Sequence, residues 1–199
     1  MNFKKLIFLF FFVSISSVYT AEIKMSFASN IPPYTFSQTN TGIELEIIGL
    51  ALAYKGHVLK PIYFPLSEVP SAFKEKKVDA AMIDLGEDLS SFAGHYANAA
   101  VLYDNVLITL KENNLDINKP EDLDGLIISS FVGAVKRYPK WLTKVKSAYN
   151  YFEENSQKLQ VLVLHKQRVD AILMDINIYK YNITNEEEGK EVRTSENWK

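Results

Sequence analysis

Cysteine is absent from this chain of 199 residues. Its absence excludes disulfide bonds, thiol catalysis, thiolate metal sites and a lipid-modified N-terminal cysteine. Histidine is also scarce, and the spacing of His57, His95 and His165 matches no metal-binding motif. Only His95, which follows a predicted strand, has a position near a possible cleft. We therefore expect neither a metal nor another cofactor.

Two further absences narrow the function. The chain has no Gly-Xaa-Ser-Xaa-Gly elbow and no phosphate-binding glycine loop, so two common enzyme motifs are missing. Its formal net charge is −2 and no basic stripe occurs, so nucleic acid is not an expected partner. The composition is 47% hydrophobic and 23% charged, which is ordinary globular usage. These features favour a globular protein that is not an enzyme.

The first 21 residues have the pattern of a secretory signal peptide. A basic start, Met1–Lys5, precedes the apolar run Leu6–Val13 and the small and polar residues Ser14–Ala21. The apolar run is too short to span a bilayer comfortably. We predict cleavage after Ala21, with cleavage after Thr20 and an uncleaved anchor as alternatives. The mature protein is then expected in the periplasm.

An internal repeat is the most informative motif. Lys77–Asp84 consists of a basic residue, Val-Asp-Ala, three apolar residues and Asp, and Arg168–Asp175 has the same composition and order. A short apolar run without alternation is typical of a strand buried on both faces. Such a strand delivers its last residue to the carboxyl edge of a parallel sheet, where open α/β sheets bind ligands. The repeat predicts two α/β lobes that offer Asp84 and Asp175 to a cleft between them.

The remaining pattern agrees with two lobes of mainly parallel sheet flanked by helices. Lobe one, residues 22–103, is predicted to contain strands at 23–28, 58–64 and 78–83 and helices at 43–55 and 66–76. Lobe two, residues 104–182, is predicted to contain strands at 126–130, 149–152 and 169–174 and helices from 134 and 156. Pro139 either kinks or delays the first of those helices. Residues 183–199 are predicted to be a polar tail or the start of a return to lobe one.

Five segments carry a family resemblance, and they occur in the family's order. They resemble the family 3 extracellular solute-binding proteins, the amino-acid-binding type with the class II periplasmic binding protein fold. The segments are Ala28–Phe36, Gly42–Ile48, Lys76–Ala80, Ile117–Gly125 and the pair Arg168–Ala171 with Asp175. The resemblance implies a monomer that closes its two lobes over a small solute. It implies further that terminal helices complete lobe one. The chain stops before them, so we expect either a truncated sequence or a lobe completed differently.

The resemblance also implies roles for particular residues. An aromatic residue after the first strand packs on the ligand in this family, and Tyr34 and Phe36 have that position. The acidic residue that closes the late strand of lobe two receives the ligand's amino group, and Asp175 has that position. We also predict that Gly133 lets backbone N–H groups at a helix start face an anion.

One departure from the family changes the expected ligand. The segment 85–95 lacks the arginine that normally clamps the ligand's carboxylate. Arg137 follows a turn in lobe two and could contact an anion, although we expect it to be a solvated helix residue. Asp84 and Asp175, with Glu44 or Glu46 nearby, instead favour a cationic or amine-bearing ligand.

The sequence therefore predicts a periplasmic solute-binding protein that captures a small, polar, amine-containing solute for uptake by an ABC transporter. The alternatives are a ligand-sensing subunit of a membrane receptor and a dehydratase-like enzyme on the same fold, in which two aspartates act as acid and base.

Overall fold

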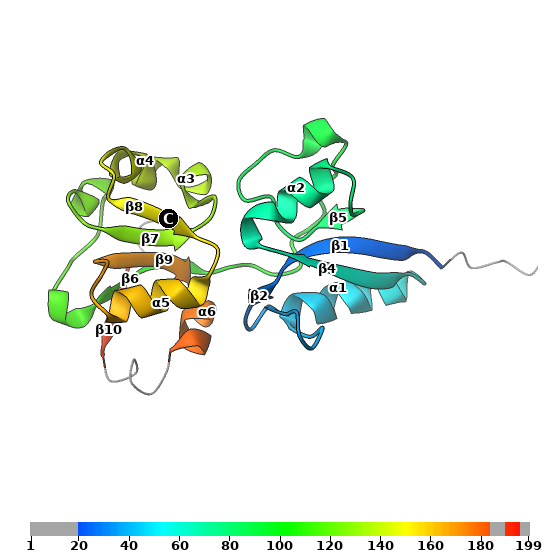
Figure 1. The fold of residues 1–199 in the computed structure, drawn as a ribbon, viewed down its shortest axis with the longest axis horizontal. Coiled ribbons are helices and arrows are strands. Elements are labelled where there is room, and N and C mark those ends of the chain that lie inside the picture. Colours follow the sequence, from blue (N-terminus) through cyan, green and yellow to red (C-terminus); the bar gives the residue numbers. More distant parts are fainter. Residues whose placement is uncertain (1–19, 184–189, 196–199) are drawn as a thin grey trace, which may run out of the picture.

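A computed structural model describes residues 20–183 and 190–195 of the chain. The predicted signal peptide lies outside these residues, apart from its last two positions. The described chain forms two α/β lobes joined by an extended segment (Figure 1). Each lobe contains its own sheet, as the repeated motif predicts.

Lobe one contains a parallel three-stranded sheet in the order β4-β1-β5, with β1 in the centre. The register runs from Glu22 opposite Val58 to Ala28 opposite Phe64. The third strand is shorter than the predicted 78–83, because only two residues pair with β1. The bounds are β1 (Glu22–Ala28), β4 (Val58–Phe64) and β5 (Ala80–Ala81).

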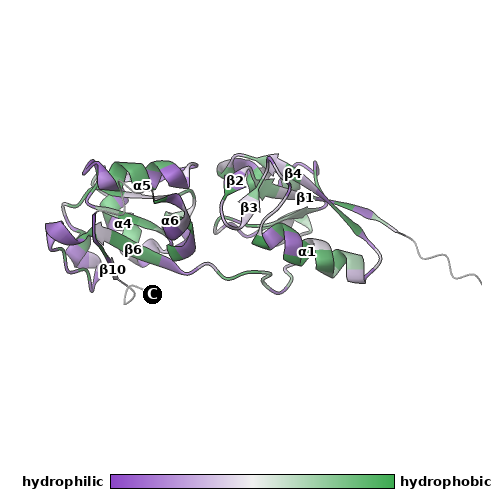
Figure 2. Cartoon of the chain, turned by 90° about the horizontal axis from the view of Figure 1, so that it is seen from below, coloured by the Kyte–Doolittle hydropathy of each residue, from purple (hydrophilic) through white to green (hydrophobic). Residues whose placement is uncertain are grey.

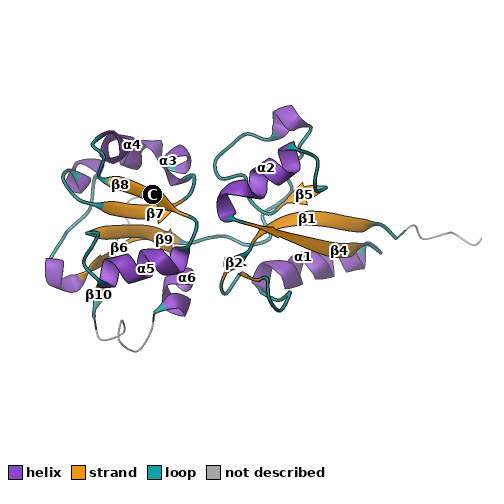
Figure 3. Ribbon diagram, viewed as in Figure 1, coloured by secondary structure: helices purple, strands orange, loops and turns teal. Residues whose placement is uncertain are grey.

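Helices cover the two faces of this sheet (Figure 3). The first helix begins directly after Gly42, where φ is +132° and an added Cβ would lie 2.3 Å from the Tyr34 carbonyl oxygen. Glycine therefore permits the close contact between the helix start and the preceding loop. The elements are β2 (Asn30–Ile31), β3 (Thr35–Phe36), α1 (Ile43–Tyr54), η1 (Leu66–Glu68), α2 (Val69–Lys74) and η2 (Ser90–Phe92).

Lobe two contains a five-stranded sheet in the order β10-β6-β9-β7-β8. Strand β7 is parallel to both β8 and β9, whereas β6 is antiparallel to β9 and to β10. All five residues of the central strand β9 are buried, which explains its continuous apolar sequence. The bounds are β6 (Asn105–Leu110), β7 (Ile128–Phe131), β8 (Tyr151–Glu154), β9 (Ala171–Asp175) and β10 (Val192–Ser195).

The helices of lobe two show what Pro139 does. It stands at the first position of a new helix, where its missing N–H has no intrahelical acceptor, so the predicted helix is divided into two. The helical elements are η3 (Lys111–Asn113), η4 (Pro120–Leu123), α3 (Ala134–Arg137), α4 (Pro139–Ser147), α5 (Gln157–His165) and α6 (Ile176–Asn182).

Residues 192–195 correct the expectation of a polar tail or a return to lobe one. They form β10 and pair with β6 from Val192 opposite Leu110 to Ser195 opposite Leu107, at the edge of the lobe-two sheet. An edge strand tolerates polar residues because one side of its backbone faces solvent. Its polar sequence therefore gave little sign of a strand. The rest of the predicted tail, 184–189 and 196–199, lies outside the described residues.

A buried hydrophobic cluster lies mainly in lobe two and extends across the contact between the lobes. Ala28, Ile31, Tyr34 and Leu85 of lobe one belong to the same buried cluster as the strands of lobe two. By contrast, apolar residues of α1 face outward from lobe one (Figure 2). Within the described ranges, no helix is long and apolar enough to cross a membrane.

Candidate functional site

The two halves of the sequence repeat end near the contact between the lobes, and Asp175 is the better buried of the two closing carboxylates. It is 1% exposed and caps α6 by accepting hydrogen bonds from the N–H groups of Asn177 and Ile178. Its other oxygen accepts a hydrogen bond of 2.7 Å from the N–H of Asp104, where the chain enters lobe two. Asp175 therefore links the end of β9, the start of α6 and the crossing segment.

Tyr34 reaches this carboxylate from lobe one. Its hydroxyl donates to Asp175 Oδ1 at 3.1 Å and accepts from Asn177 Nδ2 at 3.2 Å. Burial raises the pKa of the Tyr34 hydroxyl, and the nearby carboxylates act in the same direction. The predicted aromatic and the predicted amine receptor are thus brought together, in direct contact with each other.

Glu44 adds a second buried carboxylate to the same region. It lies in the first turn of α1, is 2% exposed, and accepts hydrogen bonds from Tyr103 at 2.7 Å and Thr35 at 3.2 Å. The Tyr103 ring packs against Tyr34 with centroids 4.6 Å apart. Desolvation raises the pKa of Glu44 to about 7, although both hydroxyl donors act to lower it. We call Tyr34, Glu44, Tyr103 and Asp175 the carboxylate cluster.

Phe36 makes a separate contact between the lobes. Its ring meets Tyr181 of α6 edge to face, with centroids 5.5 Å apart. Aromatic pairs of this edge-to-face geometry are favourable, so the contact adds to the attraction between the lobes.

Asp84 lies in a different part of the lobe contact from the carboxylate cluster. Its side chain forms an ion pair of 2.7 Å with Arg137 of α3, so Arg137 has a carboxylate partner instead of being only solvated. Glu87 strengthens this contact by pairing with Lys74 of lobe one and Lys136 of lobe two. The two aspartates of the repeat therefore do not meet in one site: Asp84 pairs with Arg137, and Asp175 belongs to the carboxylate cluster.

Gly133 explains how the lobes approach so closely beside that ion pair. Its φ is +86°, and an added Cβ would lie 2.4 Å from the carbonyl oxygen of Leu85 in lobe one. The predicted anion at the helix start is the protein's own carboxylate, because Glu153 accepts from the N–H groups of Gly133 and Val135. Gly133 therefore permits the close contact between the lobes at this point.

A cavity of about 200 Å³ lies between the lobes. The loops at 28–32 and 65–66 of lobe one form one wall, and residues 155–158 with Asn182 of lobe two form the other. A larger groove of about 610 Å³ lies between α1 and β4, but lobe one alone lines it, so closure of the lobes cannot act on it. The interlobe cavity is therefore the better candidate for a ligand site.

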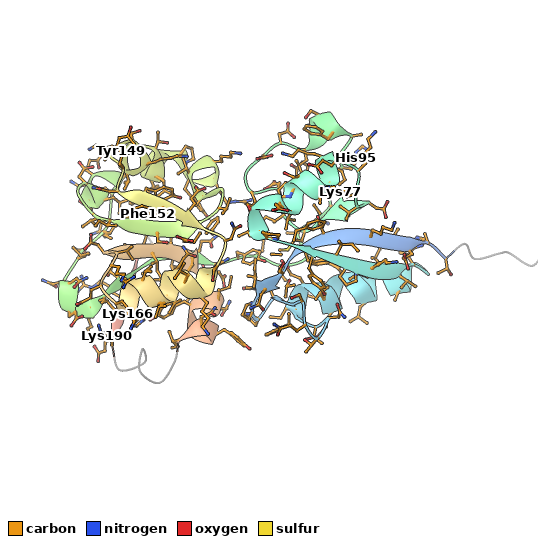
Figure 4. The ribbon with its side chains drawn as sticks, in the orientation of Figure 1. Lys77, His95, Tyr149, Phe152, Lys166 and Lys190 are labelled. Atoms are coloured by element: carbon orange, nitrogen blue, oxygen red, sulfur yellow. The ribbon has the colours of Figure 1, made fainter. Side chains whose placement is uncertain are left out.

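The sequence did not single out three residues at the lobe contact: Tyr103, Asn177 and Asn155. They have no motif of their own, and only their positions could have indicated them: Tyr103 ends predicted lobe one, and Asn155 and Asn177 follow predicted strands. The amide Oδ1 of Asn155 accepts a cross-lobe hydrogen bond of 2.8 Å from the N–H of Ser67. His95 is not near the cleft, because it lies on the part of lobe one that is distant from lobe two (Figure 4).

The described residues contain no group of three His, Cys, Asp or Glu side chains placed to hold a metal ion. What the lobe contact does contain is two buried carboxylates that accept hydrogen bonds from hydroxyl and backbone donors. Chemically, this arrangement suits the binding of a group that carries positive charge and N–H donors.

Known structures share this fold. A substrate-binding protein of an ABC uptake transporter from Streptococcus pneumoniae, with bound histidine, matches with TM-score 0.66 and 16% identity, over 87% of this chain and 73% of that one. An ancestral arginine-binding protein bound to arginine matches with TM-score 0.69 and 15% identity, over 87% and 77%. A histidine kinase sensor domain similar to periplasmic binding proteins matches with TM-score 0.66 and 15% identity, over 87% and 75%.

These likenesses define the class of fold. The chain has the two-lobed α/β fold of the amino-acid-binding periplasmic proteins, as the sequence resemblance implied. Neither protein-family models nor curated protein sequences give a match. At these identities the likeness establishes the fold, and the ligand has to be argued from this chain's own residues.

Proposed function

We propose that the chain is a periplasmic solute-binding protein that captures a small, polar, amine-containing solute between its lobes. The observation that carries the proposal is the carboxylate cluster. Asp175 and Glu44 are buried at the lobe contact, and no cation pairs with either of them among the described residues. A buried carboxylate without a cationic partner is costly, and a bound ammonium group would neutralise it.

The geometry supports a simple mode of capture. The hydroxyl of Tyr34 is the donor that lobe one places on Asp175. A ligand ammonium that took the place of the Tyr34 hydroxyl beside Asp175 would bring three N–H donors and a full positive charge. Closure would then remove the charge pair from water, which strengthens it and selects for an amine.

Delivery to a membrane transporter is the proposed consequence of capture, after removal of the signal peptide. The ABC transporter subunit from Streptococcus pneumoniae supports this use of the fold. The histidine kinase sensor domain supports the second candidate, in which the closed lobes signal to a membrane receptor. Ligand capture is common to both.

Thermal melts against amino acids, polyamines and small organic acids test the proposal. A ligand at 100 times its dissociation constant adds about 2.7 kcal/mol of stability, so its melting shift is readily seen. We expect amine ligands to stabilise the protein and Asp175→Asn to remove the effect. Asp116→Asn is the matched control, because Asp116 is an exposed aspartate of lobe two. A cooperative melt that no amine shifts would contradict amine capture.

A further inference from the structure

The cations of the ion pairs at the lobe contact are already neutralised by the protein itself. The side chain of Arg137 pairs with Asp84 at 2.7 Å. Lys74 and Lys136 both pair with Glu87, at 2.8 and 2.7 Å, and they hold the pKa of Glu87 below its usual range. A ligand carboxylate that approached any of these cations would have to compete with a carboxylate of the protein.

The backbone N–H groups that follow β7 are occupied as well. Glu153 of β8 accepts from the N–H of Gly133 at 3.0 Å and from the N–H of Val135 at 3.3 Å. The hydroxyl of Tyr151 donates to the same carboxylate at 3.0 Å. Burial raises the pKa of Tyr151, and the negative charge of Glu153 acts in the same direction. A ligand carboxylate could use these donors only by displacing Glu153 from three hydrogen bonds.

Glu153 and Asp175 stand at the same edge of the lobe-two sheet. The strands β8, β7 and β9 run parallel toward lobe one (Figure 1), and Glu153 lies opposite Ser130. Ser130 in turn lies opposite Leu173, two residues before Asp175. Because neighbouring strands are about 4.8 Å apart, Glu153 and Asp175 are separated by roughly 10 Å across the sheet. A ligand bound at Asp175 is therefore exposed to the charge of Glu153, and closure of the lobes weakens the screening of that charge.

The carboxylate cluster needs positive charge only. Asp175 and Glu44 are 1% and 2% exposed, and within the described part of the chain neither is paired with a cation. An amine supplies the missing positive charge. An amino acid also brings a negative group into a cleft that already contains Glu153, where like charges repel more strongly than in water.

One further cation, Lys158, lines the interlobe cavity. Lys158 is exposed. An ion pair at an exposed position is screened by solvent, so it changes an affinity by no more than about 5-fold. We therefore do not expect Lys158 to offset the buried carboxylates.

We infer that the solute is an amine that carries no carboxylate, and that Glu153 is the residue that excludes amino acids. The ammonium group of the solute lies at Asp175, and the charge of Glu153 disfavours an anionic group beside it. This inference rests on the proposed function, because it takes amine capture at Asp175 as its starting point. It narrows the solute class and assigns a specificity-determining residue outside the carboxylate cluster.

Calorimetric titration with matched probes tests the solute class. Each set contains an amino acid and its decarboxylated amine: lysine with 1,5-diaminopentane, arginine with agmatine, and histidine with histamine. The amide of each amino acid is included, because it has the size of the amino acid without its negative charge. In each set that binds, we expect the amine and the amide to bind at least about 10-fold more tightly than the amino acid.

A substitution at Glu153 tests the residue assignment. Glu153→Gln keeps an acceptor oxygen but removes the charge, so it should remove most of the preference, chiefly by strengthening the binding of the amino acid. Glu121→Gln is the control and should leave the preference unchanged, because Glu121 is an exposed glutamate of η4, before the start of β7. Thermal melts show whether each variant folds. If Glu153→Gln does not fold, the probes on the unaltered protein still decide the solute class.

The outcomes that overturn the inference are distinct from those that overturn the proposed function. An amino acid that binds as tightly as its amine and its amide, and loses this binding with Asp175→Asn, would overturn the inference and leave amine capture intact. So would an advantage of amino acids that Lys158→Gln removes. A preference for amines that persists in full in Glu153→Gln would overturn the role of Glu153. Failure of every probe to bind would overturn the proposed function, and the inference with it.

Discussion

The two lobes achieve their burial in different ways. In lobe two, every residue of the central strand β9 is buried beneath neighbouring strands and helices. In lobe one, the central strand β1 is buried only in its last three residues, at the end that faces lobe two. Two large side chains of α1, Leu50 and Tyr54, are 72% and 86% exposed. The central strand of lobe two is therefore buried along its whole length, whereas that of lobe one is best buried where it meets its neighbour.

This difference has a consequence for binding. A lobe that is buried mainly at the lobe contact gains stability from closure, so ligand capture and folding of lobe one should be coupled. The carboxylate cluster lies at that contact. Four substitutions test how the two lobes differ in burial and in their contact.

The largest effect is expected in the core of lobe two. Leu173→Ala removes a fully buried side chain of β9 and should cost about 2–5 kcal/mol in the free energy of unfolding. Leu50→Ala in α1 is the matched change in lobe one and should cost less than about 1 kcal/mol, because that side chain is mostly exposed. Urea unfolding of both variants measures the difference. Equal losses would show that α1 is covered in solution.

The next effect concerns Glu44 and pH. Its pKa is raised to about 7 in the folded protein, so the folded state holds a proton that the unfolded state releases between about pH 4.5 and 7. The free energy of unfolding should therefore fall as pH rises through this window, by roughly 3 kcal/mol. Below the window Glu44 contributes no pH dependence. Glu44→Gln should flatten this part of the profile in urea unfolding measured from pH 4 to 8, and an unchanged slope would refute the assignment.

A smaller effect is expected from the hydrogen bond between the lobes. Tyr34→Phe removes the hydroxyl that bonds Asp175 and should cost about 0.5–1.5 kcal/mol. Tyr63→Phe is the control, since its hydroxyl bonds Asn40 within lobe one at an exposed position. The two variants are compared by thermal melts. If Tyr63→Phe loses as much stability as Tyr34→Phe, the hydrogen bond between the lobes contributes no more than an exposed one.

The smallest effect on stability is expected from the ion pair across the lobes. Arg137→Gln breaks the contact with Asp84 at a partly exposed position and should cost no more than about 1 kcal/mol. Lys144→Gln breaks a comparable pair with Asp124 within lobe two. X-ray scattering should detect a larger radius of gyration for Arg137→Gln and not for Lys144→Gln, because the Arg137 pair joins the lobes and the Lys144 pair lies within lobe two. An unchanged radius would mean that the remaining contacts suffice for closure.

The strand and helix pattern was largely predictable where local chemistry decides it. Strand β4 occupies the predicted 58–64, and α1 ends one residue before the predicted position, since Gly42 and Gly56 mark its limits. Strand β10 was missed because a short polar edge strand has no apolar period. The third strand is short because pairing to β1, which depends on tertiary structure, determines its length.

The candidate site was predictable only in part, for a similar reason. The positions of Tyr34, Glu44 and Asp175 near strand ends and a helix start predicted that they gather at the cleft, and the structure brings them together. The pairing of Asp84 with Arg137 depends on how two lobes meet, which no local pattern encodes. The roles of all these residues in binding a ligand stay predictions.

A crystal structure of the protein with the amine that binds most tightly would show whether Asp175 receives the ligand. We expect the amine nitrogen between the lobes, within about 2.7–3.2 Å of an Asp175 oxygen. A ligand bound in the groove between α1 and β4, or between the lobes without an amine contact to Asp175, would contradict it.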